Sequence, residues 1–159
     1  MSAKRIVTFL TFNDQAEEAV TLYTALFPNS KITSTNRYPE GGPMPAGTLM
    51  SAEFELAGRP FFALNGGPSF SFSQGISLFV DCETQDDVDE LWEKLSSGGE
   101  KGPCGWLTDR FGVSWQIIPT VLGRLLSDPD PAKAQRVMNA MLQMGKIEIK
   151  KLEDAYDHA

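Results

Sequence analysis

The sequence predicts an α+β protein in which a pseudo-symmetric pair of modules is followed by a helical extension. The order strand, helix and then further strands occurs twice, each helix carries one apolar stripe, and the residues after Pro119 lose the strand pattern. At 159 residues with 42% hydrophobic content, the chain can bury a sizeable core. We assign residues 1–68 to the first module, 73–119 to the second and 120–159 to the extension.

The first module begins with a β-rich segment from Ile6 to Phe12, and a helix follows it. Asp14 is a typical helix cap, and Glu17 stands three residues later, where its side chain can bond back to the cap. The helix is expected to run to about Phe27, where Pro28-Asn29 ends it. The apolar positions recur at helical spacing and predict one buried stripe, formed by Ala16, Ala19, Val20, Tyr23 and Phe27.

Three strand-like segments complete this module. They run from Lys31 to Tyr38, from Thr48 to Leu56 and from Pro60 to Leu64, with glycine-containing breaks between them. Ala57-Gly58 is short enough to join the last two segments as a hairpin.

The second module repeats the order from Ile76 onward. A strand from Ile76 to Asp81 precedes a helix that Thr84 caps and Gly98-Gly99 ends. A hairpin follows, and Asp109 and Gly112 bracket its tight turn, because a short carboxylate bonds nearby backbone and glycine accepts a positive φ.

The last strand of this hairpin carries the most informative polar residue of the chain. Strand alternation places Gln116 on one face together with Ser114, and Trp115 on the other. A polar pair on one face can line a cavity, although a solvated face or a satisfied core amide fits the residues equally well. We expect Gln116 to face a cavity and Trp115 to face a helix.

The C-terminal extension reads as helical. A short apolar turn covers Val121 to Leu126, and Asp130-Pro131 starts a helix, because proline suits the first helical position. Met138, Met141 and Ile147 are our candidates for a dimer contact, since an amphipathic segment added to a complete fold must bury its stripe.

Composition excludes several classes of function. The formal net charge of -7 opposes a phosphate backbone, so we expect no nucleic-acid partner. Cys82 and Cys104 are too few for a disulfide framework and match no zinc spacing, which favours reduced thiols. The N-terminal residues carry no signal-type apolar region, and no apolar run is long enough for a membrane span. We therefore expect a soluble cytoplasmic protein without a membrane partner.

Several short motifs resemble one known family over nearly the whole chain. They are Ala16-Glu17-Glu18-Ala19, Asn65-Gly66-Gly67-Pro68, Cys104-Gly105-Trp106 with Asp109 and Gly112, Ser114-Trp115-Gln116, and the tail from Arg136 to Ile147. Together they are similar to the PhnB-like branch of the vicinal oxygen chelate superfamily, which includes glyoxalases, dioxygenases and bleomycin-binding resistance proteins. The branch often carries the label 3-demethylubiquinone-9 3-methyltransferase. The resemblance implies paired βαβββ modules, each curling a sheet into half a cup, in a homodimer.

The resemblance is less specific for chemistry. Superfamily enzymes hold a divalent metal with His and Glu side chains that project into the cup. Gln116 stands where a glutamate ligand ends the hairpin, Gly75 and Thr8 fall near the places of two histidines, and the chain's one histidine is His158. Because an amide oxygen is a weak ligand and glycine offers none, we expect no divalent metal and no other cofactor.

Two other features of the sequence bear on enzyme chemistry. Glu53 and Glu55 share one face of a predicted strand, where a carboxylate pair is more often solvated than ligating. No glycine-rich turn follows the segment from Ile6 to Phe12, as the common fold for S-adenosylmethionine would require. The methyltransferase label therefore has no support in the residues themselves.

The candidate site is thus a cup lined by rings and small polar groups. Large rings can stack on a flat or apolar ligand while a few polar groups orient it. The candidate ligand-binding residues are Gln116, Asn65, Trp106, Trp115, Phe62 and Phe79, and for each tryptophan packing against a covering helix is an equal alternative.

Two hypotheses for function remain. The first is a binding protein that holds a small aromatic or amphiphilic molecule without a metal. The second is an enzyme that acts on a small metabolite or a quinone-like ring, as the methyltransferase label or glyoxalase-like and dioxygenase-like relatives would suggest.

Overall fold

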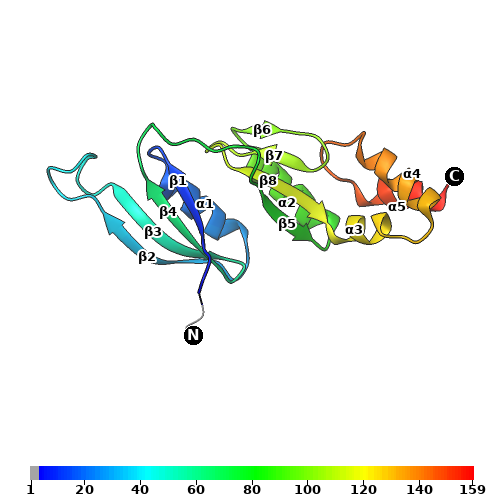
Figure 1. The fold of residues 1–159 in the computed structure, drawn as a ribbon, viewed down its shortest axis with the longest axis horizontal. Helices are drawn as coiled ribbons and strands as arrows, with labels where there is room; N and C mark the ends of the chain where they lie inside the picture. Colours follow the sequence, from blue (N-terminus) through cyan, green and yellow to red (C-terminus); the bar gives the residue numbers. More distant parts are fainter. Residues whose placement is uncertain (1–3) are drawn as a thin grey trace. The chain divides into compact units, whose positions relative to one another are not determined.

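The chain forms two compact units, of which the first ends at Ser71 and the second begins at Phe72 (Figure 1). The structure is a computed structural model, and it describes residues 4–159. Each unit contains one four-stranded sheet with a helix packed on one of its faces. The segment 120–159, which the sequence analysis treated separately, belongs to the second unit.

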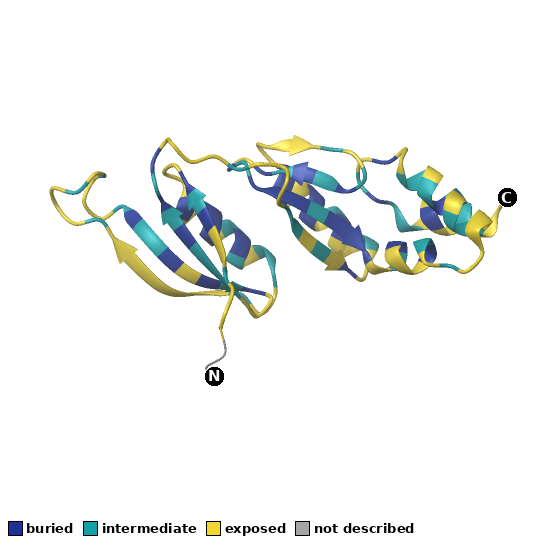
Figure 2. Cartoon of the chain, in the orientation of Figure 1, coloured by how far each residue is buried: buried dark blue, intermediate teal, exposed yellow. Residues whose placement is uncertain are grey.

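The first unit has the order strand, helix and three strands. Its elements are β1 (Thr8–Phe12), α1 (Ala16–Leu26), β2 (Lys31–Arg37), β3 (Leu49–Leu56) and β4 (Arg59–Asn65). The strands lie in the order β1-β4-β3-β2, with β1 parallel to β4 and the other neighbours antiparallel. The predicted hairpin of β3 and β4 is confirmed, and β2 forms an exposed edge (Figure 2).

Helix α1 covers one face of this sheet. Ala16, Ala19, Val20 and Tyr23 are buried, as the spacing predicted. On the strands below, Phe54 pairs with Phe61 in the antiparallel register, and their rings stack with centroids 5.3 Å apart. The opposite face of the sheet has no helix on it among the described residues.

The start of α1 differs from the predicted capping box. Residue Gln15 occupies the cap position and its side chain makes no cap bond, while Glu17 pairs with Arg37 at 2.7 Å. Asn65, at the end of β4, supplies the cap instead: its Oδ1 accepts from the Ala16 N–H at 2.8 Å. A distant strand thus caps the helix, because the parallel pairing of β1 and β4 ends beside it.

The second unit repeats the same order. Its elements are β5 (Leu78–Cys82), α2 (Gln85–Ser96), β6 (Glu100–Lys101), β7 (Trp106–Thr108) and β8 (Ser114–Pro119). The strand order β5-β8-β7-β6 matches that of the first unit, again with one parallel pair. Thr84 caps α2 by accepting from the Asp87 N–H at 3.1 Å, as predicted. The expected pair of βαβββ modules is confirmed.

Three short helices form the extension, which packs onto the second module. They are α3 (Thr120–Leu126), α4 (Pro131–Met141) and α5 (Ile149–Asp157), and Asp130 caps α4 by accepting from the Ala132 N–H. They share a buried cluster with the end of β8, made of Ile118, Leu122, Leu125, Val137, Met144, Ile147 and Leu152. Across residues 4–159, no helix combines the length and hydropathy that crossing a bilayer requires.

This packing corrects part of the predicted dimer contact. Ile147 is completely buried within its own chain, and Met138 and Met141 are half-buried. Backbone bonds also join the extension to the module, because Met144 and Gly145 accept from the N–H groups of Cys104 and Gly105 at 2.8 Å. The apolar residues of the extension that we expected to contact a partner subunit are therefore largely covered by their own chain.

We predict that Asn65→Ala lowers the free energy of unfolding by about 2–4 kcal/mol. Asn65 is 1% exposed, and besides capping α1 it donates to the Leu49 carbonyl at 2.9 Å, so its loss leaves two buried backbone groups unpaired. Urea unfolding followed by circular dichroism measures the change. Asn36→Ala, which removes an exposed amide on β2, is the control and should have a small effect. Equal effects of both variants would contradict the role of Asn65.

Candidate functional site

The open face of the second sheet brings three predicted site residues into one row. Phe79 on β5 is the register partner of Gln116 on β8, and Gln116 is the partner of Trp106 on β7. Partners across neighbouring strands project from the same face, so the amide lies between two rings. Phe79 is 56% exposed, whereas Trp106 and Gln116 are half-buried. The structure therefore assembles half of the predicted ligand-binding set.

The Gln116 amide is held in place by Ser77, the residue directly before β5. Its Nε2 donates to Ser77 Oγ at 2.9 Å, which leaves the Gln116 carbonyl oxygen without a partner among residues 4–159. Gly75, which falls near the place of a histidine ligand in the family pattern, lies in the loop before β5. Ser77 is thus the side chain that orients the amide.

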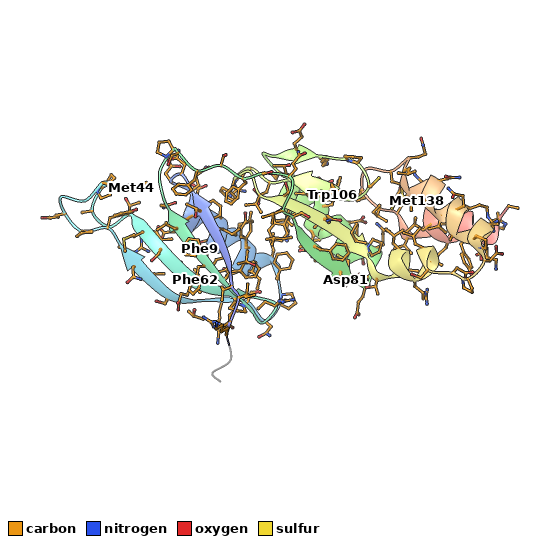
Figure 3. All side chains as sticks on the ribbon, in the orientation of Figure 1. Phe9, Met44, Phe62, Asp81, Trp106 and Met138 are labelled. Carbon is orange, nitrogen blue, oxygen red and sulfur yellow. The ribbon has the colours of Figure 1, made fainter. Side chains whose placement is uncertain are left out.

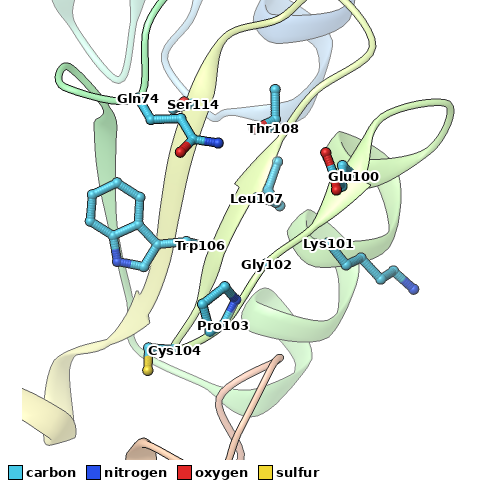
Figure 4. Close-up of a pocket in the computed structure, with 10 residues that line it drawn as sticks. All are labelled: Gln74, Glu100, Lys101, Gly102, Pro103, Cys104, Trp106, Leu107, Thr108 and Ser114. Carbon is cyan, nitrogen blue, oxygen red and sulfur yellow. The ribbon is translucent and has the colours of Figure 1, made fainter.

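Trp106 separates two hollows on this face. The larger has a volume of about 610 Å³, and Figure 4 shows Trp106, Gln74, Thr108 and Ser114 around it. The hydroxyl of Ser114 is buried and has no hydrogen-bond partner among the residues described. A buried hydroxyl without a partner is costly, so Ser114 is an unsatisfied polar group in the wall of this hollow.

The second hollow extends from the row toward the C-terminal extension. Its volume is about 340 Å³, and its lining includes Asp81 and Trp106, both labelled in Figure 3. One wall comes from the sheet, and the other comes from helices α3 and α4 of the extension. The side chains that line the second wall are Leu122, Leu126 and Met141.

Trp115 lies outside this site. It is 2% exposed on the opposite face of β8, which α2 covers, and its indole N–H donates to Asp109 Oδ2 at 2.9 Å. Asp109 Oδ1 accepts from the backbone N–H groups of Phe111 and Val113, so one buried carboxylate organises the turn and the ring. Of the two alternatives for Trp115, packing under a helix is the one observed.

Asn65 and Phe62 belong to the first unit. The Asn65 amide is buried and bonded to backbone at both ends, so it presents no surface to a ligand. Phe62 lies on the open face of β4, where its ring centroid is 5.8 Å from that of Phe9. It also neighbours Glu53 in the register, and all three line a hollow of about 240 Å³. This row corresponds to Phe79, Gln116 and Trp106 in the second sheet.

Cys82 and Cys104 are free thiols. Burial raises the pKa of the Cys82 thiol to about 12, and the carboxylates of Asp87 and Asp81 add to the increase. Such a thiol stays protonated at neutral pH. Cys104 is half-buried, and its Sγ lies 3.6 Å from the Met141 carbonyl oxygen. Both cysteines fit structural roles.

The residues on the open face do not fit an iron or zinc centre. Within residues 4–159 there is no group of three or more His, Cys, Asp or Glu side chains placed to hold a metal ion. The second hollow offers one amide, one carboxylate and the Cys104 thiol, and the single histidine, His158, is exposed near the C-terminus. Thiolate and imidazole donors, which these metals prefer, are missing from the row.

Sequence reasoning missed Ser77, Asp81 and the wall that the extension provides. The first two carried a usable signal, because alternation along the strand from Ile76 to Asp81 places Ser77, Phe79 and Asp81 on one face. The wall carried no such signal, since its position depends on how α3 and α4 fold back onto the module.

Two βαβββ modules with open sheet faces define a protein of the vicinal oxygen chelate superfamily. The family model described as 3-demethylubiquinone-9 3-methyltransferase matches residues 4–118, and the chain belongs to this family. The match ends at the last residues of β8, so it does not include the extension.

Solved structures agree with this assignment. A PhnB protein from Bacillus cereus shares 38% identity over 74% of this chain and 100% of its own, with a TM-score of 0.68. A protein from Pseudomonas aeruginosa (22% identity, 74% and 98% of the two chains, TM-score 0.60) shares the fold. So does the fosfomycin resistance protein FosX from Listeria monocytogenes, solved with Mn(II) (15% identity, 72% and 90%, TM-score 0.52). No curated protein matches the chain.

We predict that Ser114→Ala leaves the free energy of unfolding unchanged or raises it by up to about 1 kcal/mol. The substitution removes a buried hydroxyl that has no partner among the described residues and keeps the small apolar volume. Chemical denaturation of the two proteins provides the comparison. A loss of more than about 1 kcal/mol would mean that the hydroxyl has a hydrogen-bond partner in solution.

Proposed function

We propose that this protein binds a small aromatic or amphiphilic molecule on the open face of its second sheet, without a divalent metal. The observation that carries the proposal is the row of Phe79, Gln116 and Trp106, in which one oriented amide lies between two large rings. Rings of this kind bury flat or apolar surface, and a single amide can fix the orientation of a ligand.

The polar groups around the row support a binding role. The carbonyl oxygen of Gln116 has no partner among residues 4–159 and can accept a hydrogen bond from a ligand, whereas the Ser114 hydroxyl is buried and also lacks a partner. They lie on the same strand two residues apart and so face the same side. A ligand with a hydrogen-bond donor beside an aromatic surface satisfies the Gln116 carbonyl oxygen.

Enzyme function is the alternative, and the match to a methyltransferase family is the observation that favours it. The turn between β1 and α1, residues 13–15, contains no glycine, so it lacks the close backbone approach by which common S-adenosylmethionine folds hold that cofactor. The open face also presents no pair of a general base and an activated nucleophile. The residues on the open face therefore supply what a binding protein needs, but not the catalytic groups that an enzyme needs.

We also propose that the protein works as a homodimer. Several large apolar side chains on or beside the sheets are exposed, including Phe9 at 54%, Ile32 at 44% and Ile76 at 78%. An exposed apolar side chain gains free energy when a partner covers it. A second copy of the chain is the partner that the family resemblance implies.

We predict that Gln116→Ala weakens binding of 2-naphthylmethanol by about five- to thirty-fold, because the amide hydrogen bond is lost between the rings. Isothermal titration calorimetry measures the dissociation constant. Gln135→Ala is the control, since Gln135 is an exposed amide on α4 that bonds Asn139. Unchanged affinity in Gln116→Ala would place the site elsewhere, and methyl transfer from S-adenosylmethionine that disappears in this variant would establish the enzyme.

Native mass spectrometry of freshly purified protein should show a dimer without a stoichiometric divalent ion. The donor set on the open face is too weak for iron or zinc, and the exposed apolar groups favour self-association. Treatment with a chelator should leave the mass of the dimer unchanged. One divalent ion per subunit, removed by the chelator, would contradict the metal-free proposal, and a monomer at micromolar concentration would contradict the dimer.

A further inference from the structure

The hollow between the second sheet and the extension has one aromatic wall and one aliphatic wall. Phe79 and Trp106 provide rings on one side, and Leu122, Leu126 and Met141 provide an aliphatic wall on the other. The three aliphatic residues lie in the extension, beyond the residues that the family model matches. An apolar body of moderate size fits between these two surfaces.

One charged side chain faces this hollow. Asp81 lies two residues after Phe79 on β5 and therefore on the same face, next to its register partner Ile118. The lining includes no lysine or arginine, and the Asp81 carboxylate has no ion pair or hydrogen bond among residues 4–159. The carboxylate is therefore free to meet a positive charge brought by a ligand.

The aromatic groups favour the same charge. A cation placed over the face of a tryptophan or phenylalanine ring is attracted by the negative face of the π-system. Trp106 and Phe79 flank Gln116 in the row directly beside Asp81 and Ile118. An anion would meet the carboxylate and a chain of net charge -7, with no basic side chain in the hollow to offset them.

We propose that this hollow takes an organic cation with an apolar body, such as a quaternary or protonated amine attached to a ring or a short alkyl chain. The cationic head lies between Asp81 and the rings of Trp106 and Phe79, and the apolar body contacts Leu122, Leu126 and Met141. This inference rests on the proposed function, because it assumes that the open face binds small molecules, and it adds the charge and shape of the ligand.

Three naphthalene probes that differ in charge test the proposal: 2-naphthylmethyl-trimethylammonium, 2-naphthylmethanol and 2-naphthylacetate. Calorimetric titration of the full chain should give the tightest binding for the cation, about ten-fold tighter than the alcohol, and the weakest for the anion. Asp81→Asn should reduce the preference for the cation over the alcohol from about ten-fold to about two- to four-fold, because the rings of Trp106 and Phe79 still attract a cation. Asp157→Asn, which makes the same charge change at an exposed position at the end of α5, should keep the ten-fold preference.

The outcomes separate this inference from the proposed function. If the alcohol binds and depends on Gln116 while the cation gains nothing over it, the cation preference is wrong and the binding function stands. If Asp81→Asn and Asp157→Asn reduce the preference equally, net charge rather than the hollow selects the cation, and the inference is also wrong. If no probe binds to the wild-type chain, the inference and the proposed function both fail.

Discussion

The second module depends on one buried carboxylate. Asp109 is 3% exposed and accepts from two backbone N–H groups of the turn and from the Trp115 indole. These three bonds fix the hairpin of β7 and β8, because they hold the turn closed and anchor the strand that leaves it. With that register set, Trp106 stands beside Gln116, so the candidate site depends on a turn that it does not contain.

The two modules use the same framework for different surfaces. In each, a parallel pair joins the first and last strands, and a helix covers one face. The open faces then differ in chemistry: the row in the first sheet is Phe9, Phe62 and Glu53, and the row in the second is Phe79, Gln116 and Trp106. The shared strand order thus places three side chains in a row on each open face, and the identity of those side chains decides the chemistry of the row.

The extension shows how an added segment can become part of a site. Its apolar residues bury one another against Ile118 at the end of β8, and backbone bonds tie the connection after α4 to Cys104 and Gly105. Gly105 adopts φ +82°, and a Cβ there would lie 2.7 Å from the Ile118 side chain, so only glycine permits this close approach. Leu126 and Met141 reach the second hollow as a consequence of this docking.

The sequence by itself determined the local elements, because helical and strand periodicities and turn residues act over a few neighbours. It predicted the doubled strand and helix order, the Thr84 cap, the turn at Asp109 and the separation of Gln116 from Trp115. Only the tertiary structure decided which distant groups meet. Asn65 caps α1 and Ser77 orients Gln116 because strand pairing brings together residues 49 and 39 positions apart. Ile147 lies within its own chain rather than at a surface because the extension docks against Ile118 at the end of β8. No local pattern encodes such contacts, because they arise from the free energy of the whole packed unit.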